Sequence, residues 1–455
     1  MKRSNSRNLK ILLAIFFVLG LFTMTTAQTL DKAKLDQFFD RLAEKNKAMG
    51  SLVIARDGKV VYQRTIGYGQ ITDAEKKPLS AASKFRIGSI TKMFTAAMIM
   101  QLVDEKKLKL TDTLDKFLPQ VPNAQKITIA QILSHRSGIH DSLIDPKMRT
   151  PAARLAGASK DELLAIVAKA APDFEPDAEH RYSNTGYFLL GLVIEKVTGR
   201  SYEANLEKRI TSKLGLKDTF AATGNIDPSK NEALSYTYFT EWKPVPETNP
   251  SNLFGAGTIV STPFDLVKFI QALFDGKIVS KESLALMKTM RDGEGMGMEP
   301  FTFDGKTFYG HTGGVDNFGA WLAYEPEERV ALAYTSNAKV YPVKDIVSGV
   351  ADIYYGKPFQ VPTFESFAVA QEILDKYVGV YSVPGAPAKI TITRDGTTLL
   401  FQPPGSPPVP LEATAVDKFK IDNGTPTGIV VKFDAAKNTM TIKRNGGERV
   451  LTKEK

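Results

Sequence analysis

The chain has 455 residues, 43% of them hydrophobic and 24% charged, so it is long enough for two or three globular domains. Its formal charge is +9, but basic and acidic residues alternate along it and no basic block with interleaved aromatic residues occurs. We therefore expect no nucleic-acid partner. Cysteine is absent, which excludes disulfides, a thiolate nucleophile and cysteine-ligated zinc.

The N-terminus has the pattern of an export signal. Four basic residues among the first ten precede an apolar run over residues 11–22, and Thr25-Thr26-Ala27 offers a cleavage site. We expect residues 1–27 to be a signal peptide. The mature chain would then begin at Gln28 in the periplasm or outside the cell, without a stable membrane span; an uncleaved anchor is the competing interpretation.

The next segment predicts a helix followed by a hairpin. Residues 30–46 show helical spacing of apolar residues, and residues 51–69 alternate around Asp57-Gly58, a strong turn signal. A mainly helical stretch follows. Its start and stop signals predict helices after the capping pair Ser159 and Glu162, over residues 186–199, and after Thr262-Pro263.

Strand patterns return at residues 306–313 and 319–337, and a helix over residues 343–356 follows. Strands at both ends of this region predict an α/β domain over residues 28–358, with one antiparallel sheet flanked by helices and a helical lobe beside it. A proline-containing linker is expected at 359–370. Residues 371–455 read as short strands separated by turns, which predicts a small all-β barrel-like domain.

Ser89 and Lys92 stand one helical turn apart at the start of an apolar segment. Side chains at i and i+3 share a helix face, so Lys92 points at the Ser89 hydroxyl. Burial lowers a lysine pKa and favours the neutral amine, which can accept the serine proton. The alternative is a capping serine with a lysine that extends to solvent. The same spacing at Ser336 and Lys339 is given no role.

Two further motifs accompany this pair. Tyr182-Ser183-Asn184 is the sole Tyr-x-Asn in the sequence and immediately precedes an apolar helix. His311-Thr312-Gly313 follows a strand and opens the glycine-containing stretch "HTGGVDNFG". Each motif alone is typical of an ordinary turn or loop.

Together and in this order, the motifs resemble the serine β-lactamases and penicillin-binding DD-peptidases, specifically the class C β-lactamase-like branch. The segments "FRIGSITKMFTA", "ILSHRSGIHD" and "FGAGTIVSTPFDLVKF" add to the resemblance, which covers about residues 30–355. The predicted C-terminal barrel lies outside it, as an extension.

The resemblance implies a role for each motif residue. Ser89 would be the acylated nucleophile, Lys92 its proton acceptor, and Tyr182 the group that passes the proton to the leaving group. For the substrate-binding set, Asn184 would contact the substrate amide, His311 and Thr312 would lie on the strand that binds substrate, and Gly314 N–H would join Ser89 N–H in the oxyanion hole.

His311 departs from the β-lactamase pattern, which has lysine there. Histidine offers a cation to a substrate carboxylate only when it is protonated, below a pKa near roughly 6.5. The His-Thr-Gly form resembles that of DD-carboxypeptidases, D-amino-acid peptidases and some esterases, which implies peptide or ester cleavage in preference to efficient penicillin hydrolysis. We expect protonated His311 to assist in carboxylate binding.

The sequence thus predicts an exported serine hydrolase that acts through an acyl-enzyme on D-amino-acid peptides or small esters. Its partners would be a small peptide, ester or β-lactam, and no cofactor or metal is expected, since His135, His140 and His180 follow no metal-ligand spacing. Three alternatives stay open: a penicillin-binding sensor that is acylated without turnover, a true β-lactamase, and a chain whose barrel binds a polymer and determines the function.

Overall fold

The computed structural model describes residues 30–238, 240–364, 367–383, 389–405, 408–421, 429–444 and 447–454. The signal peptide predicted over residues 1–27 lies outside these ranges. No helix among the described residues combines the length and the apolar character needed to cross a bilayer.

The centre of the larger domain is an antiparallel sheet with strand order β10-β11-β12-β13-β1-β2. Its strands are β1 (Ala48–Arg56), β2 (Lys59–Ile66), β10 (Glu299–Phe303), β11 (Lys306–Val315), β12 (Phe318–Glu325) and β13 (Val330–Lys339). β1 pairs with β13 along its whole length, so the two ends of the domain meet in one sheet as the sequence predicts. The β1–β2 turn has positive φ at Asp57 (49°) and Gly58 (76°), as a tight hairpin requires.

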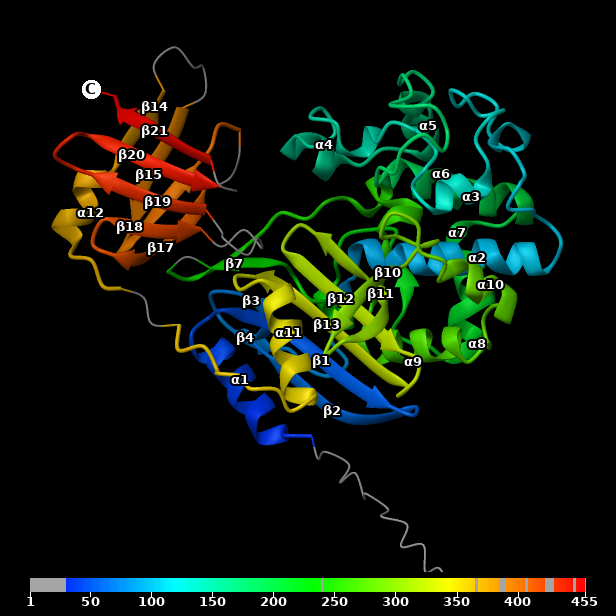
Figure 1. Ribbon diagram of the computed structural model, residues 1–455, viewed down its shortest axis with the longest axis horizontal. Helices are drawn as coiled ribbons and strands as arrows, with labels where there is room; N and C mark the ends of the chain where they lie inside the picture. Colours follow the sequence, from blue (N-terminus) through cyan, green and yellow to red (C-terminus); the bar gives the residue numbers. More distant parts are fainter. Residues whose placement is uncertain are drawn as a thin grey trace, which may run out of the picture.

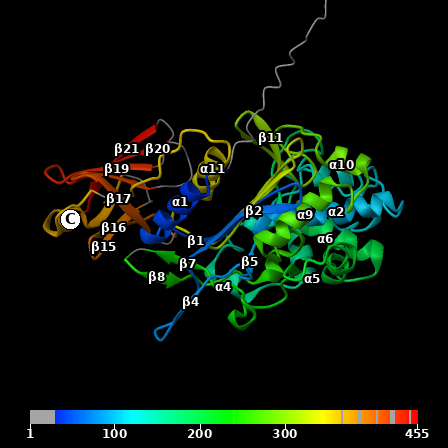
Figure 2. The same ribbon diagram turned by 90° about the horizontal axis from the view of Figure 1, so that it is seen from below.

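Helices cover both faces of this sheet, as the two views of the molecule show (Figures 1 and 2). α1 (Lys32–Glu44) and α11 (Val343–Tyr354) pack on one face, where Phe38, Phe39 and Val347 are fully buried. α9 (Pro263–Phe274) packs on the other face against β1, β12 and β13. Because both faces are covered, β1 is buried from its first residue to its last but one.

A helical lobe lies beyond α9. Its helices are α2 (Thr91–Asp104), α3 (Ile129–Leu133), α4 (Pro151–Ala156), α5 (Lys160–Val167), α6 (Asn184–Thr198), α7 (Tyr202–Leu206), α8 (Ser212–Leu214) and α10 (Lys281–Met287). Small two- and three-stranded sheets join it to the rest: β3 (Tyr68–Ile71) with β4 (Lys76–Pro78), β5 (Phe85–Arg86) with β9 (Ile259–Ser261) and β6 (Phe220–Ala221), and β7 (Tyr236–Tyr238) with β8 (Trp242–Pro244).

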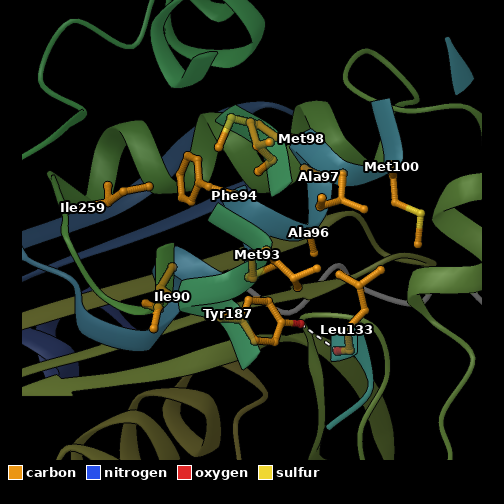
Figure 3. Packing of buried hydrophobic residues seen from close by; sticks show 14 of the residues in the cluster. Ile90, Met93, Phe94, Ala96, Ala97, Met98, Met100, Leu133, Tyr187 and Ile259 are labelled. Atoms are coloured by element: carbon orange, nitrogen blue, oxygen red, sulfur yellow. Dashed lines mark hydrogen bonds between the residues drawn. The ribbon is translucent and has the colours of Figure 1, made fainter. Parts of the chain in front are cut away.

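α2 is the central helix of this lobe and is buried on all sides. Figure 3 shows Phe94, Ala97 and Met98 pointing into the surrounding core, with Tyr187 of α6 donating a hydrogen bond to the Leu133 carbonyl. Burial on every side fixes α2 in position, and with it the residues at its N-terminus.

The C-terminal region is a closed eight-stranded antiparallel barrel. Its strands are β14 (Gly379–Ser382), β15 (Lys389–Asp395), β16 (Thr398–Gln402), β17 (Val409–Ala415), β18 (Lys418–Ile421), β19 (Ile429–Asp434), β20 (Thr439–Arg444) and β21 (Gly447–Lys453). A short helix that the sequence pattern did not predict, α12 (Gln371–Tyr377), precedes them and contributes Leu374 and Tyr377 to the barrel core. The observed α/β domain followed by an all-β barrel confirms the predicted fold class.

Candidate active site

Ser89 lies in a single 3-10 turn, Gly88–Ile90, directly before α2. The sequence placed it on the helix itself; the structure places it two residues before the helix begins at Thr91. Gly88 has a positive φ of 51°, and a Cβ on Gly88 would come within 2.6 Å of the Gly314 nitrogen of β11. Glycine at both positions therefore lets β11 lie directly against the turn that carries Ser89.

Lys92 is fully buried one turn after Ser89, with its Nζ 3.1 Å from Ser89 Oγ. Nζ also lies 2.9 Å from Asn184 Oδ1 and 3.0 Å from the Ala256 carbonyl oxygen, so it does not extend to solvent. Burial lowers the pKa of Lys92 to about 7, although the charges of Asp141, Glu294 and Glu299 oppose the shift. A substantial fraction of the amine is therefore neutral near neutral pH.

Tyr182 approaches the same hydroxyl from the segment before α6. Its phenol donates a hydrogen bond of 2.9 Å to Ser89 Oγ. Burial raises the pKa of Tyr182, so the phenol keeps its proton at neutral pH. Ser89 Oγ thus has two neighbours with opposite capacities: an amine that can accept a proton and a phenol that can donate one.

Asp141 fixes the third motif residue, Asn184. Its carboxylate accepts hydrogen bonds of 3.0 Å from Asn184 N and from Asn184 Nδ2, and further bonds from Thr185 N and Oγ1. Because Nδ2 faces this carboxylate, Oδ1 must face Lys92. Asp141 stands within "ILSHRSGIHD", so the sequence contained the residue, but no pattern indicated that it would orient Asn184.

His135 supports Tyr182 from behind. Their rings stack with centroids 4.4 Å apart, and His135 Nδ1 accepts a hydrogen bond of 3.0 Å from Ser183 N. His180 instead pairs with Glu294, with His180 Nε2 2.9 Å from Glu294 Oε2. In the part of the chain that the structure describes, no group of three or more histidines and carboxylates is arranged to hold a metal ion.

His311 lies on β11 beneath the cleft and has only 3% of its surface exposed. Burial, together with the nearby charge of Lys92, lowers the pKa of His311 to about 3. Its Nδ1 donates to the Thr312 carbonyl at 2.5 Å and lies 3.5 Å from Glu299 Oε1. The expectation that protonated His311 offers a cation to a substrate carboxylate is therefore wrong, because the buried ring is neutral at ordinary pH.

The free edge of β11 faces the serine turn. β10 pairs with β11 only up to Gly310, so residues 311–315 are unpaired on that side and pair with β12 on the other. A Cβ on Gly313 would meet the Ile87 carbonyl oxygen at 1.9 Å and Ser89 N at 3.3 Å. The backbone of Gly313 and Gly314 therefore lies in contact with Ser89, beside an edge on which an extended substrate can add as a strand.

These groups open into one cleft of about 570 Å³, a volume suited to a small peptide or a drug-sized molecule. Ser89, Tyr182, Asn184 and Gly314 line it, whereas Lys92 and His311 lie beneath its floor. The structure thus brings most of the motif residues together from three segments far apart in the chain. Thr312, predicted to bind substrate, is the exception: it does not line this cleft but lines a separate pocket with Gly319 and Val343.

The comparisons with known proteins agree with this geometry. The family profile described as Beta-lactamase matches residues 35–351 of the chain. Penicillin-binding protein 4* of Bacillus subtilis is 28% identical over 390 residues, which cover 79% of this chain and 85% of that protein.

Solved structures show the same fold. The octameric penicillin-binding protein homologue from Pyrococcus abyssi is 27% identical with a TM-score of 0.64, and the match covers 93% of this chain and all of that one (100%). The D-amino acid amidase from Ochrobactrum anthropi is 26% identical with a TM-score of 0.63, over 71% of this chain and 99% of the amidase. The D-stereospecific amidohydrolase from Streptomyces is 29% identical with a TM-score of 0.61, over 72% and 100% respectively.

The Ser89 hydroxyl contacts both a buried amine and a phenol, and the fold is shared with penicillin-binding proteins and D-amino acid amidases. Together these findings identify the family of the chain. The chain belongs to the Beta-lactamase family, and it is a serine hydrolase.

Proposed function

We propose that this protein hydrolyses D-amino-acid-containing peptides or amides through an acyl-enzyme on Ser89. The observation that carries the proposal is the position of Ser89 Oγ, with Lys92 Nζ at 3.1 Å and the Tyr182 hydroxyl at 2.9 Å. The printed names of two similar structures, a D-amino acid amidase and a D-stereospecific amidohydrolase, support D-configured amides over other substrates of the fold.

In the acylation step, Ser89 Oγ attacks the substrate carbonyl while neutral Lys92 takes the hydroxyl proton. The backbone N–H groups of Ser89 and Gly314 stabilise the resulting oxyanion, a contribution typically worth about 3 kcal/mol for each donor. Tyr182 gives its proton to the departing nitrogen, and the ammonium of Lys92, whose Nζ lies 4.7 Å from the centre of the Tyr182 ring, returns a proton to the Tyr182 oxygen. The C–N bond breaks and the acyl group stays on Ser89.

Deacylation uses the same groups with water as the nucleophile. Tyr182 and Lys92 remove one proton of the water and return it to Ser89 Oγ as the ester bond breaks. The second amide hydrogen of Asn184 can bond an amide carbonyl elsewhere in the acyl group, since only one of the two is directed at Asp141.

A substrate panel tests the proposal. Purified protein is incubated with a D-Ala-D-Ala peptide, its L-Ala-L-Ala counterpart, a p-nitrophenyl ester and a chromogenic cephalosporin, and turnover and protein mass are followed together. We expect turnover of the D-peptide and none of the L-peptide. Turnover of the cephalosporin alone would identify a β-lactamase, hydrolysis of the ester alone an esterase, and a stable mass increase without turnover a penicillin-binding sensor.

We also propose that the protein is exported. The basic residues and apolar run of the first 27 residues support this location. Mass spectrometry of the protein recovered from the cell envelope or medium is expected to find Gln28 at its N-terminus. Recovery of an intact Met1 in the membrane fraction would identify an uncleaved anchor instead.

A further inference from the structure

Four charged side chains line the catalytic cleft: Arg149, Arg154, Asp316 and Lys339. Arg154 and Asp316 form an ion pair, and Thr248 also donates to Asp316 from its backbone and its hydroxyl. Asp316, the one acid among the described residues that line the cleft, therefore already has three hydrogen-bond donors as partners. Two cations, Arg149 and Lys339, remain to determine the charge that the cleft accepts.

Lys339 is the better placed of these two cations. It ends β13, a strand held on both sides by β1 and β12, whereas Arg149 lies in an exposed connection before α4. A Cβ on Gly314 would lie 3.7 Å from Lys339 Nζ, so the ammonium is beside the β11 edge that contacts Ser89. The rigid strand holds the charge near the scissile bond of any substrate attached to Ser89.

The ammonium of Lys339 has no partner of its own. Within the described ranges of the chain, the structure records no hydrogen bond or ion pair to Lys339 Nζ. Protein atoms around it displace water and lower its pKa, an effect that the charge of Asp316 opposes. Because the Lys339 side chain is exposed at the cleft wall, and Asp316 is engaged by Arg154 and Thr248, the ammonium is available to bind an anion in the cleft.

The surface next to Lys339 extends the same charge. A groove of about 540 Å³ between the larger domain and the barrel shares Lys339 with the catalytic cleft, and Lys45, Lys47 and Lys420 also line it. Among the described residues on its walls there is one acid, Glu412, and it pairs with Lys420 at 3.5 Å. An acidic substrate longer than the cleft therefore continues into a region that also favours negative charge.

From these observations we propose that Lys339 binds a carboxylate of the substrate next to the scissile bond. This inference rests on the proposed function and deepens it, because it makes an acidic peptide the preferred substrate. Lys339 would then bind the substrate carboxylate, which neutral, buried His311 does not attract. The second Ser-x-x-Lys motif then has a use after all: Ser336 is sequestered in the sheet, and only its lysine reaches the active site.

The test compares matched substrates that differ only in one carboxylate. The first pair, N-acetyl-D-Ala-D-Ala and its C-terminal amide, differs in the carboxylate of the departing residue. The second pair, N-succinyl-D-Ala amide and N-acetyl-D-Ala amide, differs in a carboxylate on the acyl side. KM is measured for each pair with the wild-type protein, Lys339→Met, Arg149→Gln and the control Lys344→Met, which removes a nearby charge that does not line the catalytic cleft.

We expect the wild-type protein to prefer the carboxylate in one pair by about tenfold, the value of one charge-assisted hydrogen bond. K339M should reduce that ratio of KM values to about one, while K344M should preserve it. A ratio that survives K339M, or that is lost only in R149Q, overturns the inference, as does a ratio near one for both wild-type pairs. Absence of hydrolysis of all four substrates, by contrast, contradicts the proposed function itself.

Discussion

Burial controls the protonation of the side chains around Ser89. It lowers the pKa of Lys92 to about 7 and that of His311 to about 3, and it raises the pKa of Tyr182. All three shifts favour the neutral form, because a low-dielectric environment stabilises uncharged groups. The floor of the cleft therefore carries proton-transfer groups with little net charge, and the charged groups stand on its walls.

Removal of either proton-transfer group should nearly abolish turnover. Lys92→Ala and Tyr182→Phe are each expected to lower kcat by about 10²–10⁴, the usual contribution of general acid–base assistance. Turnover of a D-peptide and the circular-dichroism spectrum are measured together, so that loss of folding is recognised. Near wild-type turnover in either folded variant contradicts the scheme.

Ser89, and not Ser336, should react with a fluorophosphonate probe. Ser336 Oγ is buried within hydrogen-bond distance of two backbone carbonyls, 2.8 Å from Met49 O and 2.9 Å from Ala338 O, whereas Ser89 lines the cleft. Peptide mapping of the labelled protein should find the adduct on Ser89. Ser336→Ala serves as the control and should be labelled like the wild type; label on any other serine rejects the assignment.

Acylation should depend on pH through Lys92. Only the neutral amine accepts a proton, so the rate with an uncharged ester should rise as pH increases through about 7 and then level off. Burial also raises the pKa of Glu299 to about 7, and this carboxylate titrates in the same range. Glu299→Gln separates the two groups.

In Glu299→Gln, the rise in acylation rate with pH should persist but occur at a slightly lower pH. Loss of the negative charge disfavours the ammonium form of Lys92 and so lowers its pKa further. Disappearance of the rise would instead assign it to Glu299. Stopped-flow measurement of acylation at pH 5 to 9 gives both profiles.

At the scale of elements, the site depends on close contact between β11 and the turn before α2. No side chain separates the two, because glycines stand at the points of approach. Helix α2 is fixed by burial on all sides, and β11 by its pairing with β12, so the distance between them is set by packing alone.

Gly313→Ala tests that contact. The added Cβ would meet the Ile87 carbonyl oxygen at 1.9 Å, so β11 must move away from Ser89. We expect turnover to fall by about tenfold or more and stability by about 1–3 kcal/mol, the usual effect of overpacking. Gly224→Ala is the matched control, since nothing lies within 4 Å of its added Cβ; equal turnover in the two variants would refute a role for the close contact.

At the scale of the whole molecule, the segment predicted as a linker is partly attached to the larger domain. The ring of Phe359 packs against Phe38 of α1 with centroids 4.9 Å apart, and Phe364 packs against Tyr341 at 5.0 Å. A chain cut at Gly356 therefore loses contacts that belong to the α/β domain.

Two truncated chains distinguish this attachment from a need for the barrel. A chain ending at Phe364 should stay folded and still be labelled at Ser89, since it keeps both aromatic contacts. A chain ending at Gly356 should have a melting temperature several degrees lower, because Phe38 becomes exposed. Loss of labelling in the longer chain would show that the barrel completes the catalytic site.

The sequence by itself determined the local structure and the candidates for catalysis. Helical spacing, caps and turn residues act over a few residues, so the helices, the hairpin at Asp57-Gly58 and the barrel strands could be predicted from pattern. The i, i+3 spacing placed Lys92 beside Ser89 for the same reason. Helix α12 was missed, because its seven residues are too few for a clear periodic signal.

Only the tertiary structure decided how these groups behave. Tyr182 reaches Ser89 from 93 positions away, and Asp141 orients Asn184 across 43. The neutrality of His311 and the exposure of Lys339 to the cleft depend on what packs around each side chain, which no local pattern encodes. Desolvation and charge are properties of a three-dimensional neighbourhood. For that reason the sequence identified the chemical groups, while the fold determined their protonation.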